Sequence, residues 1–294
     1  MSDTEPSSQV EAEVENLTET LALEPIEVNL FRGLTSGRDG PRIFGGHVIA
    51  QSLMAAYETV EDRVCHSLHC YFIRPGDPNV PILYDVDRSR DGSSFTTRRV
   101  TAIQHGHQIF NLAASFQVVE DGLEHQTEMP HVPPPDALQD TFEQFRKQMD
   151  ALPEEARRMM SRPRPIEQRS VNPRGPTEKA PPYSNVWMRA RAEIGPNQHL
   201  HQAILAYASD MGLLETSMRP HGVTWQTGGL QSASLDHAIW FHRPCNFNDW
   251  HLYAQESPSA SGARGFIRGQ VFSESGVLVA SIAQEGLIRR RKPA

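Results

Sequence analysis

One aspartate stands out as suited to chemistry because its neighbours are almost all apolar. Asp210 lies near the end of a segment, 198–212, whose residues favour a helix. Burying a carboxylate without partners costs several kcal/mol, and aspartate is a poor residue inside a helix. The residues alone leave two interpretations open. Either the carboxylate is kept for a function, or Asp210 turns to solvent before Gly212.

Two further polar residues lie in predicted strands of the same half. Gln284 follows small and apolar residues in the strand predicted at 277–288. Its amide both donates and accepts hydrogen bonds, as the positioning of a water molecule requires. Ser234 opens the strand predicted at 234–242. Taken alone, each residue is more often a structural hydrogen-bonding residue.

An internal repeat supplies a test of these residues. The segment 71–75 (Tyr-Phe-Ile-Arg-Pro) matches 240–244 (Trp-Phe-His-Arg-Pro) at an offset of 169 residues (243 minus 74). The turns at Gly106 and Gly276 match at an offset of 170 (276 minus 106). A repeat of this size indicates two copies of one fold in the chain.

The three polar residues are not repeated in the first copy. They fall on apolar or small residues there: Asp210 on Thr59, Ser234 on Cys65, and Gln284 on Ala114. Residues needed only for folding would be kept in both copies. The asymmetry therefore predicts one functional site in the second copy, with the first copy as scaffold and part of the pocket wall.

Each copy must supply elements that hold such a site. In the first copy a strand at 21–31 precedes a helix at 48–57, which is apolar on nearly every face, and strands at 66–73, 82–88, 94–104 and 108–118. In the second, strands at 166–171 and 186–192 precede the helix at 198–212 and strands at 234–242, 251–256, 263–272 and 277–288. One buried helix followed by antiparallel strands predicts an α+β fold in which a sheet curls around a helix.

The predicted organisation has five parts. They are a disordered acidic tail (1–20), the first copy (21–120), a Pro-rich linker with a surface helix (121–165), the second copy (166–290) and a basic tail (291–294).

The composition of the chain limits which binding partners and which cellular compartment we expect. A net charge of -8 argues against nucleic acid as the main partner. No apolar run approaches the roughly 18 residues of a membrane span. Three cysteines are too few for a disulfide framework, and the acidic N-terminal region lacks the features of a secretory signal. The C-terminal Lys-Pro-Ala is not the Ser-Lys-Leu peroxisomal address. We expect a cytoplasmic protein without nucleic-acid or membrane partners.

The sequence lacks the motifs that would indicate metal binding, a serine nucleophile or phosphate binding. The thirteen histidines do not join cysteines or carboxylates at zinc spacing, so no metal is expected. There is no Gly-x-Ser-x-Gly motif, and the Gly45-Gly46 pair favours close packing at a helix start over phosphate binding. No cofactor is predicted.

Many segments resemble those of the type II acyl-CoA thioesterases, which are double-hotdog proteins. They span about residues 31–289 and include Phe44-Gly-Gly-His47, Tyr71-Phe-Ile-Arg-Pro-Gly-Asp77, Ala113-Ala-Ser-Phe-Gln117, Tyr207-Ala-Ser-Asp210, Leu235-Asp-His237, Trp240-Phe-His-Arg-Pro244 and Gln284-Glu-Gly286. The resemblance implies a tandem hotdog, with an N-terminal unit at 21–120 and a C-terminal unit at 166–290. It also implies hydrolysis of acyl-CoA to free acid and CoA, and assembly into homo-oligomers, either dimers or tetramers.

The resemblance also implies roles for single residues. Asp210 would act as general base on a water molecule that Ser234 and Gln284 orient, with Ser234 in place of the family's usual threonine. The backbone N–H of Gly46 is a candidate to stabilise the oxyanion. Arg264 and Arg268 are candidates to meet the CoA phosphates, or else are surface charges of a strand.

Two alternative functions remain open at this point. A non-catalytic acyl-CoA binding or regulatory protein would bind without releasing thiol. A hotdog enoyl-thioester hydratase would need a histidine paired with the acid, but His201 is nine residues before Asp210 and falls on about the opposite side of the helix.

Overall fold

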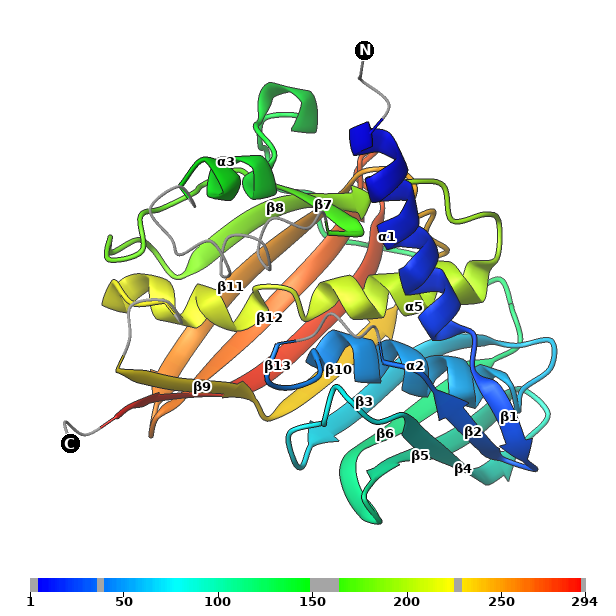
Figure 1. The fold of residues 1–294 in the computed structure, drawn as a ribbon. Helices are drawn as coiled ribbons and strands as arrows, with labels where there is room; N and C mark the ends of the chain where they lie inside the picture. Colours follow the sequence, from blue (N-terminus) through cyan, green and yellow to red (C-terminus); the bar gives the residue numbers. More distant parts are fainter. Residues whose placement is uncertain (1–4, 36–39, 149–163, 225–228, 292–294) are drawn as a thin grey trace.

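The sheet of this protein is one continuous antiparallel layer that curls around two central helices (Figure 1). The computed structural model describes residues 5–35, 40–148, 164–224 and 229–291. The strand order is β1-β2-β4-β5-β6-β3-β10-β13-β12-β11-β8-β7, with β9 paired to β13. The second half of this order mirrors the first, and the halves join where β3 pairs with β10.

The elements follow the same order in both halves. The first half contains β1 (Glu24–Glu27), β2 (Leu30–Gly33), α2 (Gly45–Tyr57), β3 (Val64–Phe72), β4 (Ile82–Asp91), β5 (Phe95–Gln104) and β6 (His107–Gln117). The second half contains β7 (Ile166–Ser170), β8 (Tyr183–Ala190), α5 (Gln198–Ser209), the 3-10 helix η3 (Leu213–His221), β9 (Leu230–Ser234), β10 (Asp236–Phe241), β11 (His251–Ser261), β12 (Arg264–Ser273) and β13 (Leu278–Arg290). This is the tandem helix-and-sheet architecture that the sequence predicts.

Strand pairing confirms the offsets of the repeat. His69 pairs with Ala113 between β3 and β6, and the residues at the predicted offsets, Ala238 and Ala283, pair between β10 and β13. Likewise, Arg98 of β5 pairs with Ala114 of β6 in the first half, and the equivalent residues Ile267 and Gln284 pair between β12 and β13 in the second half. The two halves can therefore be compared residue by residue.

The two central helices run antiparallel and pack against each other. The end of α5 lies at the start of α2, where a Cβ on Gly45 would come 2.7 Å from a carboxylate oxygen of Asp210. At the other end, the Tyr57 ring of α2 stacks on His199 of α5 with ring centroids 3.8 Å apart. Asn197 caps α5 by accepting the backbone N–H groups of His199 and Leu200. Each helix thus brings its C-terminal end to the N-terminus of the other.

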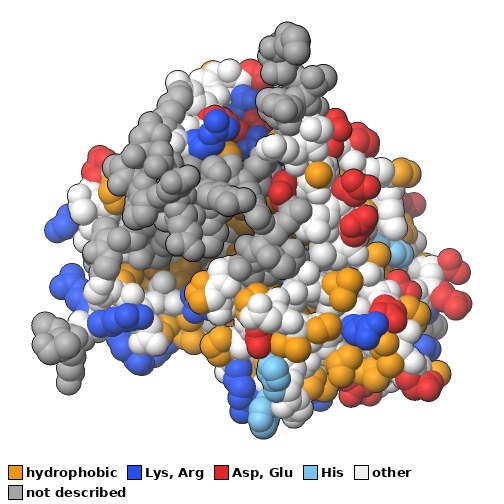
Figure 2. Space-filling view, viewed as in Figure 1, with side chains coloured by type: hydrophobic (Ala, Val, Ile, Leu, Met, Phe, Trp, Pro, Cys, Tyr) orange, Lys and Arg blue, Asp and Glu red, His pale blue; other side chains and the backbone are white. Residues whose placement is uncertain are grey.

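The prediction of a disordered tail at 1–20 is wrong for the residues of this segment that the structure describes. Residues Glu5–Leu21 form helix α1, which buries Val14, Leu17 and Leu21 in the main core. These apolar residues recur at helical spacing, while acidic side chains line the exposed side of α1 (Figure 2). The helical period, rather than the acidic composition, decides the structure here.

The strand predicted at 21–31 is a hairpin instead. β1 and β2 pair across a turn in which Asn29 takes a positive φ of 64°. The strand predicted at 234–242 begins only at Asp236, as β10, while Ser234 is the last residue of the separate strand β9.

The linker region does more than connect the halves. It contains the 3-10 helix η1 (Pro135–Ala137) and helix α3 (Thr141–Gln148), while 149–163 lies outside the described residues. Linker side chains, including Met129, pack on a second hydrophobic cluster around Trp187 and Trp250. The Trp187 indole N–H donates to the carbonyl of Pro133 at 2.9 Å. The linker therefore covers part of the C-terminal sheet.

Residues 292–294 of the predicted basic tail lie outside the described residues. Among the described residues, no helix has the length and apolar character needed to cross a membrane.

Candidate active site

Asp210 occupies the C-terminal cap of α5 and is buried. Its backbone leaves the helix at φ -83° and ψ -10°, and Gly212 then takes a positive φ of 75° that starts η3. Only 9% of Asp210 is exposed. The interpretation in which Asp210 turns to solvent is therefore wrong, because the turn instead points it toward the start of α2.

The structure brings the three predicted site residues together. Ser234, at the end of β9, donates its hydroxyl to Asp210 Oδ1 at 3.2 Å. Gln284 of β13 donates its amide to Ser234 Oγ at 3.1 Å. Gln284 lies opposite Ile267, whose side chain is in the main core, so the amide faces the helices. Three elements far apart in sequence thus converge on one carboxylate.

The surroundings of Asp210 favour a proton acceptor that works near neutral pH. Burial raises the pKa of Asp210 to about 7, against the opposing effects of the Ser234 hydroxyl, the Gly46 N–H, the Gln284 amide and the charge of Arg42. Arg42 also donates to the backbone carbonyl of Ser232 at 3.2 Å. A carboxylate with this pKa can take a proton from water and release it again.

Gly46 has a different partner from the one expected. Its N–H donates to Asp210 in this structure, because an unpaired N–H at the start of a helix attracts a carboxylate. The expected role as oxyanion donor is therefore not supported by the geometry. A Cβ on Gly46 would come 2.3 Å from the Tyr207 carbonyl oxygen, so glycine allows the close approach of the two helices.

Arg264 and Arg268 do not join this cluster. Both lie on the face of β12 opposite to Ile267, since side chains alternate along a strand. Arg264 pairs with Glu285 at 2.8 Å and Arg268 with Glu256 at 2.5 Å. The structure thus supports the interpretation of both as surface charges of a strand, because each guanidinium already has an acidic partner on the outer face.

His237 is a member of the cluster that the sequence interpretation missed. Its Nδ1 lies 2.5 Å from Gln284 Oε1, and its Nε2 lies 2.9 Å from Ser209 Oγ. Burial lowers the pKa of His237 to about 4, so the ring is neutral at physiological pH. The repeat carried the signal, since His237 falls on the apolar Leu68 at the offset of 169 (237 minus 68).

His201, considered for hydratase chemistry, lies elsewhere. Its Nδ1 accepts the backbone N–H of Phe247 at 3.0 Å, and the side chain is buried near the start of α5. It contributes to folding rather than to the Asp210 cluster.

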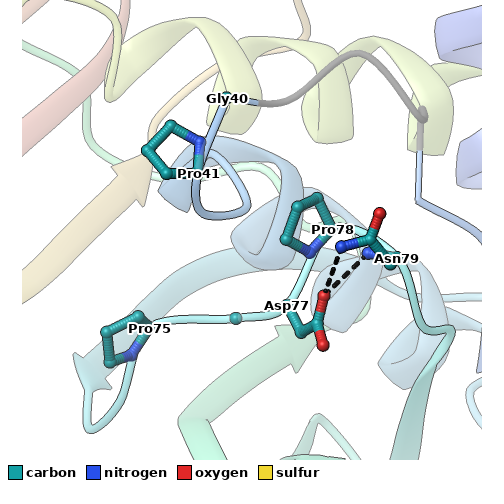
Figure 3. Close-up of a pocket in the computed structure, with 7 residues that line it drawn as sticks. Gly40, Pro41, Pro75, Asp77, Pro78 and Asn79 are labelled. Carbon is teal, nitrogen blue, oxygen red and sulfur yellow. Dashed lines mark hydrogen bonds between the residues drawn. The ribbon is translucent and has the colours of Figure 1, made fainter.

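A surface pocket of about 430 Å³ lies on the first half, between residues 40–41 and the loop at 75–79. Figure 3 shows Asp77 there, accepting hydrogen bonds from the backbone and side chain of Asn79 at 2.9 and 3.0 Å. Among the described residues that line it, none is basic, which does not suit the phosphates of CoA. Within the described parts of the chain, no group of three or more His, Cys, Asp or Glu is placed to hold a metal ion.

Comparison with known proteins gives consistent matches over both halves. A family model described as acyl-CoA thioesterase matches residues 156–287, and one described as acyl-CoA thioesterase N-terminal domain matches residues 35–117. Acyl-CoA thioesterase 2 of Haemophilus influenzae is 42% identical over 93% of this chain and 97% of its own length. Human acyl-coenzyme A thioesterase 8 is 42% identical over 93% of this chain and 88% of its own.

Solved structures agree in fold. The acyl-CoA thioesterase II TesB2 of Mycobacterium marinum is 40% identical and superposes with a TM-score of 0.76 over 95% of this chain and 99% of that one. A hot dog fold protein from Alicyclobacillus acidocaldarius, 18% identical, also has a TM-score of 0.76 over 95% of this chain and 98% of that one. The predicted double hotdog is confirmed, and with it the predicted family: this chain belongs to the acyl-CoA thioesterases.

Proposed function

We propose that this thioesterase hydrolyses acyl-CoA with a water molecule that Asp210 activates and that Ser234 and Gln284 orient. The observation that carries the assignment is the convergence of these three side chains at the junction of α5 and α2. The hydrolysis of acyl-CoA thioesters follows from the family. The assignment of the residues is supported by geometry and by their absence from the first half.

Asp210 would remove a proton from the attacking water. Because its pKa is raised to about 7, the carboxylate is a stronger base than an ordinary aspartate and is still substantially ionised at neutral pH. The Gly46 N–H and the N-terminal end of α2 keep this anion in place.

Ser234 and Gln284 would fix where the water lies. Each offers polar atoms beside the carboxylate, so a water bound to them is held next to its base, and orientation of this kind lowers the barrier strongly. After attack on the thioester carbonyl, CoA leaves as a thiolate. A thiolate is a good leaving group, so the step needs no strong general acid.

Thiol release tests this proposal. Purified wild type and Asp210→Asn would be assayed on acyl-CoAs of several chain lengths, with the exposed Asp85→Asn as matched control. We expect turnover by wild type, a loss of at least about a hundredfold in Asp210→Asn, and normal rates in the control. Since the base must be ionised, the wild-type rate should rise with pH and level off above about pH 7.

Other outcomes point elsewhere. Full activity of Asp210→Asn would keep the family activity and reject this site. Binding of acyl-CoA without thiol release by wild type would favour the non-catalytic binding protein. Hydration of an enoyl-CoA without thiol release would favour the hydratase.

We also propose that the chain assembles into a homo-oligomer. Exposed apolar side chains gather over β1, β2 and β4 (Figure 2), among them Ile26, Val28 and Leu83. Apolar patches of this kind mark interaction surfaces. Light scattering would give a mass that is a multiple of 32.9 kDa, and a monomer would reject the proposal.

On the sequence grounds above we further propose a cytoplasmic location, which cell fractionation would test.

A further inference from the structure

His237 lies directly behind the proposed catalytic amide. It belongs to β10, is 1% exposed, and contacts Gln284 on one side of the ring and Ser209 on the other. We propose that His237 is a positioning residue that fixes the orientation of the Gln284 amide, so that the Ser234 hydroxyl is left free to donate to Asp210. This inference rests on the proposed function of the Asp210 cluster.

The directions of the hydrogen bonds follow from the carboxylate. Ionised Asp210 only accepts, so the single proton of Ser234 is used toward it. Ser234 must then accept from Gln284, which places the NH₂ group of the amide at Ser234. The carbonyl oxygen of Gln284 is therefore the atom that meets His237.

That carbonyl needs a donor, and His237 can supply one. An N–H at Nδ1 pointing at Gln284 Oε1, 2.5 Å away, leaves Nε2 as an acceptor in the neutral ring. Ser209 Oγ is within reach of Nε2 at 2.9 Å and of the Ala206 carbonyl at 2.8 Å. Ser209 has a single hydroxyl proton, which in this arrangement goes to Nε2 rather than to the Ala206 carbonyl, and one chain of hydrogen bonds then runs from Ser209 to Asp210.

An amide without this donor has a competing orientation. If Gln284 turned over, its carbonyl would face Ser234 and compete with Asp210 for the serine proton. The water-binding arrangement would then be only partly populated. While Nδ1 carries the proton, His237 opposes this flip, because its Nδ1–H favours the carbonyl and disfavours the NH₂ group; donation by Ser209 to Nε2 favours this tautomer.

The repeat argues that this histidine is not needed for folding. Leu68 occupies the equivalent position of β3 and is fully buried. The first half builds the same strand pairing with an apolar side chain there. Like Asp210, Ser234 and Gln284, His237 is therefore specific to the half that carries the site.

Two substitutions separate positioning from packing. His237→Leu copies the residue of the first half and removes the donor. His237→Asn keeps an N–H close to the place of Nδ1. We expect kcat to fall about ten- to a hundredfold in His237→Leu with KM changed by less than about threefold, and most of the loss to be restored in His237→Asn. His251→Leu, at a buried histidine outside the cluster, is the matched control and should leave kcat unchanged.

The pH profile gives a readout that packing alone would not move. In His237→Leu, Asp210 shares the Ser234 proton with Gln284, so a hydrogen bond that lowers the Asp210 pKa is weakened. The rising limb of kcat/KM should move up by about 0.5 to 1 pH unit. The other groups that face Asp210 are unchanged in this variant: the Gly46 N–H, Arg42, Cys70 and Tyr253. The Cys70 thiol, which donates to the His237 carbonyl at 3.2 Å, is also kept.

Each result decides between the inference and the proposed function. An inactive Asp210→Asn with wild-type kcat and pH profile in His237→Leu would overturn the inference and leave the function intact. If His237→Leu and His237→Asn were equally impaired and the rising limb of kcat/KM stayed in place, His237 would have a packing role. That result would overturn the inference as well. An active Asp210→Asn would reject the site itself. Thermal melts of both His237 variants would confirm that they are folded.

Discussion

Asp210 is held where its charge works against the folded state. Its pKa is raised from an ordinary 3.8 to about 7, so the folded protein binds this proton more tightly than the unfolded chain does. Between about pH 4 and pH 7 the folded state therefore carries more protons, and its stability falls as pH rises through this window. The ionised carboxylate costs the fold on the order of 4 kcal/mol above pH 7. Sites that need a buried base commonly carry such a cost.

Asp210→Asn should accordingly raise stability while it removes activity. Asparagine keeps hydrogen-bonding capacity and loses the buried charge. We expect its melting temperature to exceed that of wild type, with a gap that is larger at pH 8 than at pH 5. Calorimetry at the two pH values checks this, with the exposed Asp85→Asn as the matched control. A gap that is absent or larger at pH 5 would mean that Asp210 is not destabilised by burial.

At the scale of elements, the site depends on how closely α2 approaches the end of α5. Glycine at positions 45 and 46 makes the approach possible, because a Cβ there would meet Asp210 or the Tyr207 backbone. The same approach brings the Gly46 N–H to the Asp210 carboxylate. The start of α2 therefore serves packing and electrostatics at once.

Gly46→Ala should disturb both. With its Cβ 2.3 Å from the Tyr207 carbonyl oxygen, the helices must move apart, and we expect a loss of about 1–3 kcal/mol in stability. The N–H would be displaced from Asp210, so kcat should fall more than tenfold. Gly40→Ala is the control, since a Cβ there meets no described residue within 4 Å. Denaturant unfolding and thiol release measure the two effects, and equal behaviour of the two variants would contradict this account.

Across the whole molecule, the parts that repeat were predictable and the parts that depend on local geometry were not. The offsets of 169 and 170 fix the strand register that is observed. They also single out Asp210, Ser234 and Gln284 as unmatched. The break at Leu235, by contrast, follows from where β13 changes partner from β10 to β9, which no local pattern reveals.

Two departures from what the local sequence suggests have a common physical cause. The N-terminal region looks acidic and polar on average, yet α1 folds because Leu17 and Leu21 share one helical face. The Gly46 N–H, a candidate to stabilise the oxyanion, donates in this structure to a carboxylate from the other half. In both cases contacts made across the molecule override the composition of the local segment.

The two halves of the molecule also predict how many sites a chain has. In the first half, Arg98 stands at the place of Ile267 and is 2% exposed. Its Nε and Nη2 donate to the hydroxyl and carbonyl oxygens of Thr59 at 2.8 and 2.9 Å, so the guanidinium fills the space beside the position equivalent to Asp210. Arg98 also pairs with Asp91 at 2.6 Å. The place equivalent to Asp210 is thus occupied by Thr59 bonded to a cation rather than by a base, and the Arg98 side chain takes up space beside it.

We therefore expect one substrate site per chain rather than two. Isothermal titration with a non-hydrolysable acyl-CoA thioether should give a stoichiometry near one per chain, whatever the oligomeric state. Asp210→Asn titrated with a true acyl-CoA should give the same value, because the substitution removes the base and leaves the pocket. A stoichiometry near two in both titrations would mean that the first half binds substrate despite Arg98. The first half would then recognise the substrate without the counterparts of Asp210, Ser234 and Gln284 that catalysis needs.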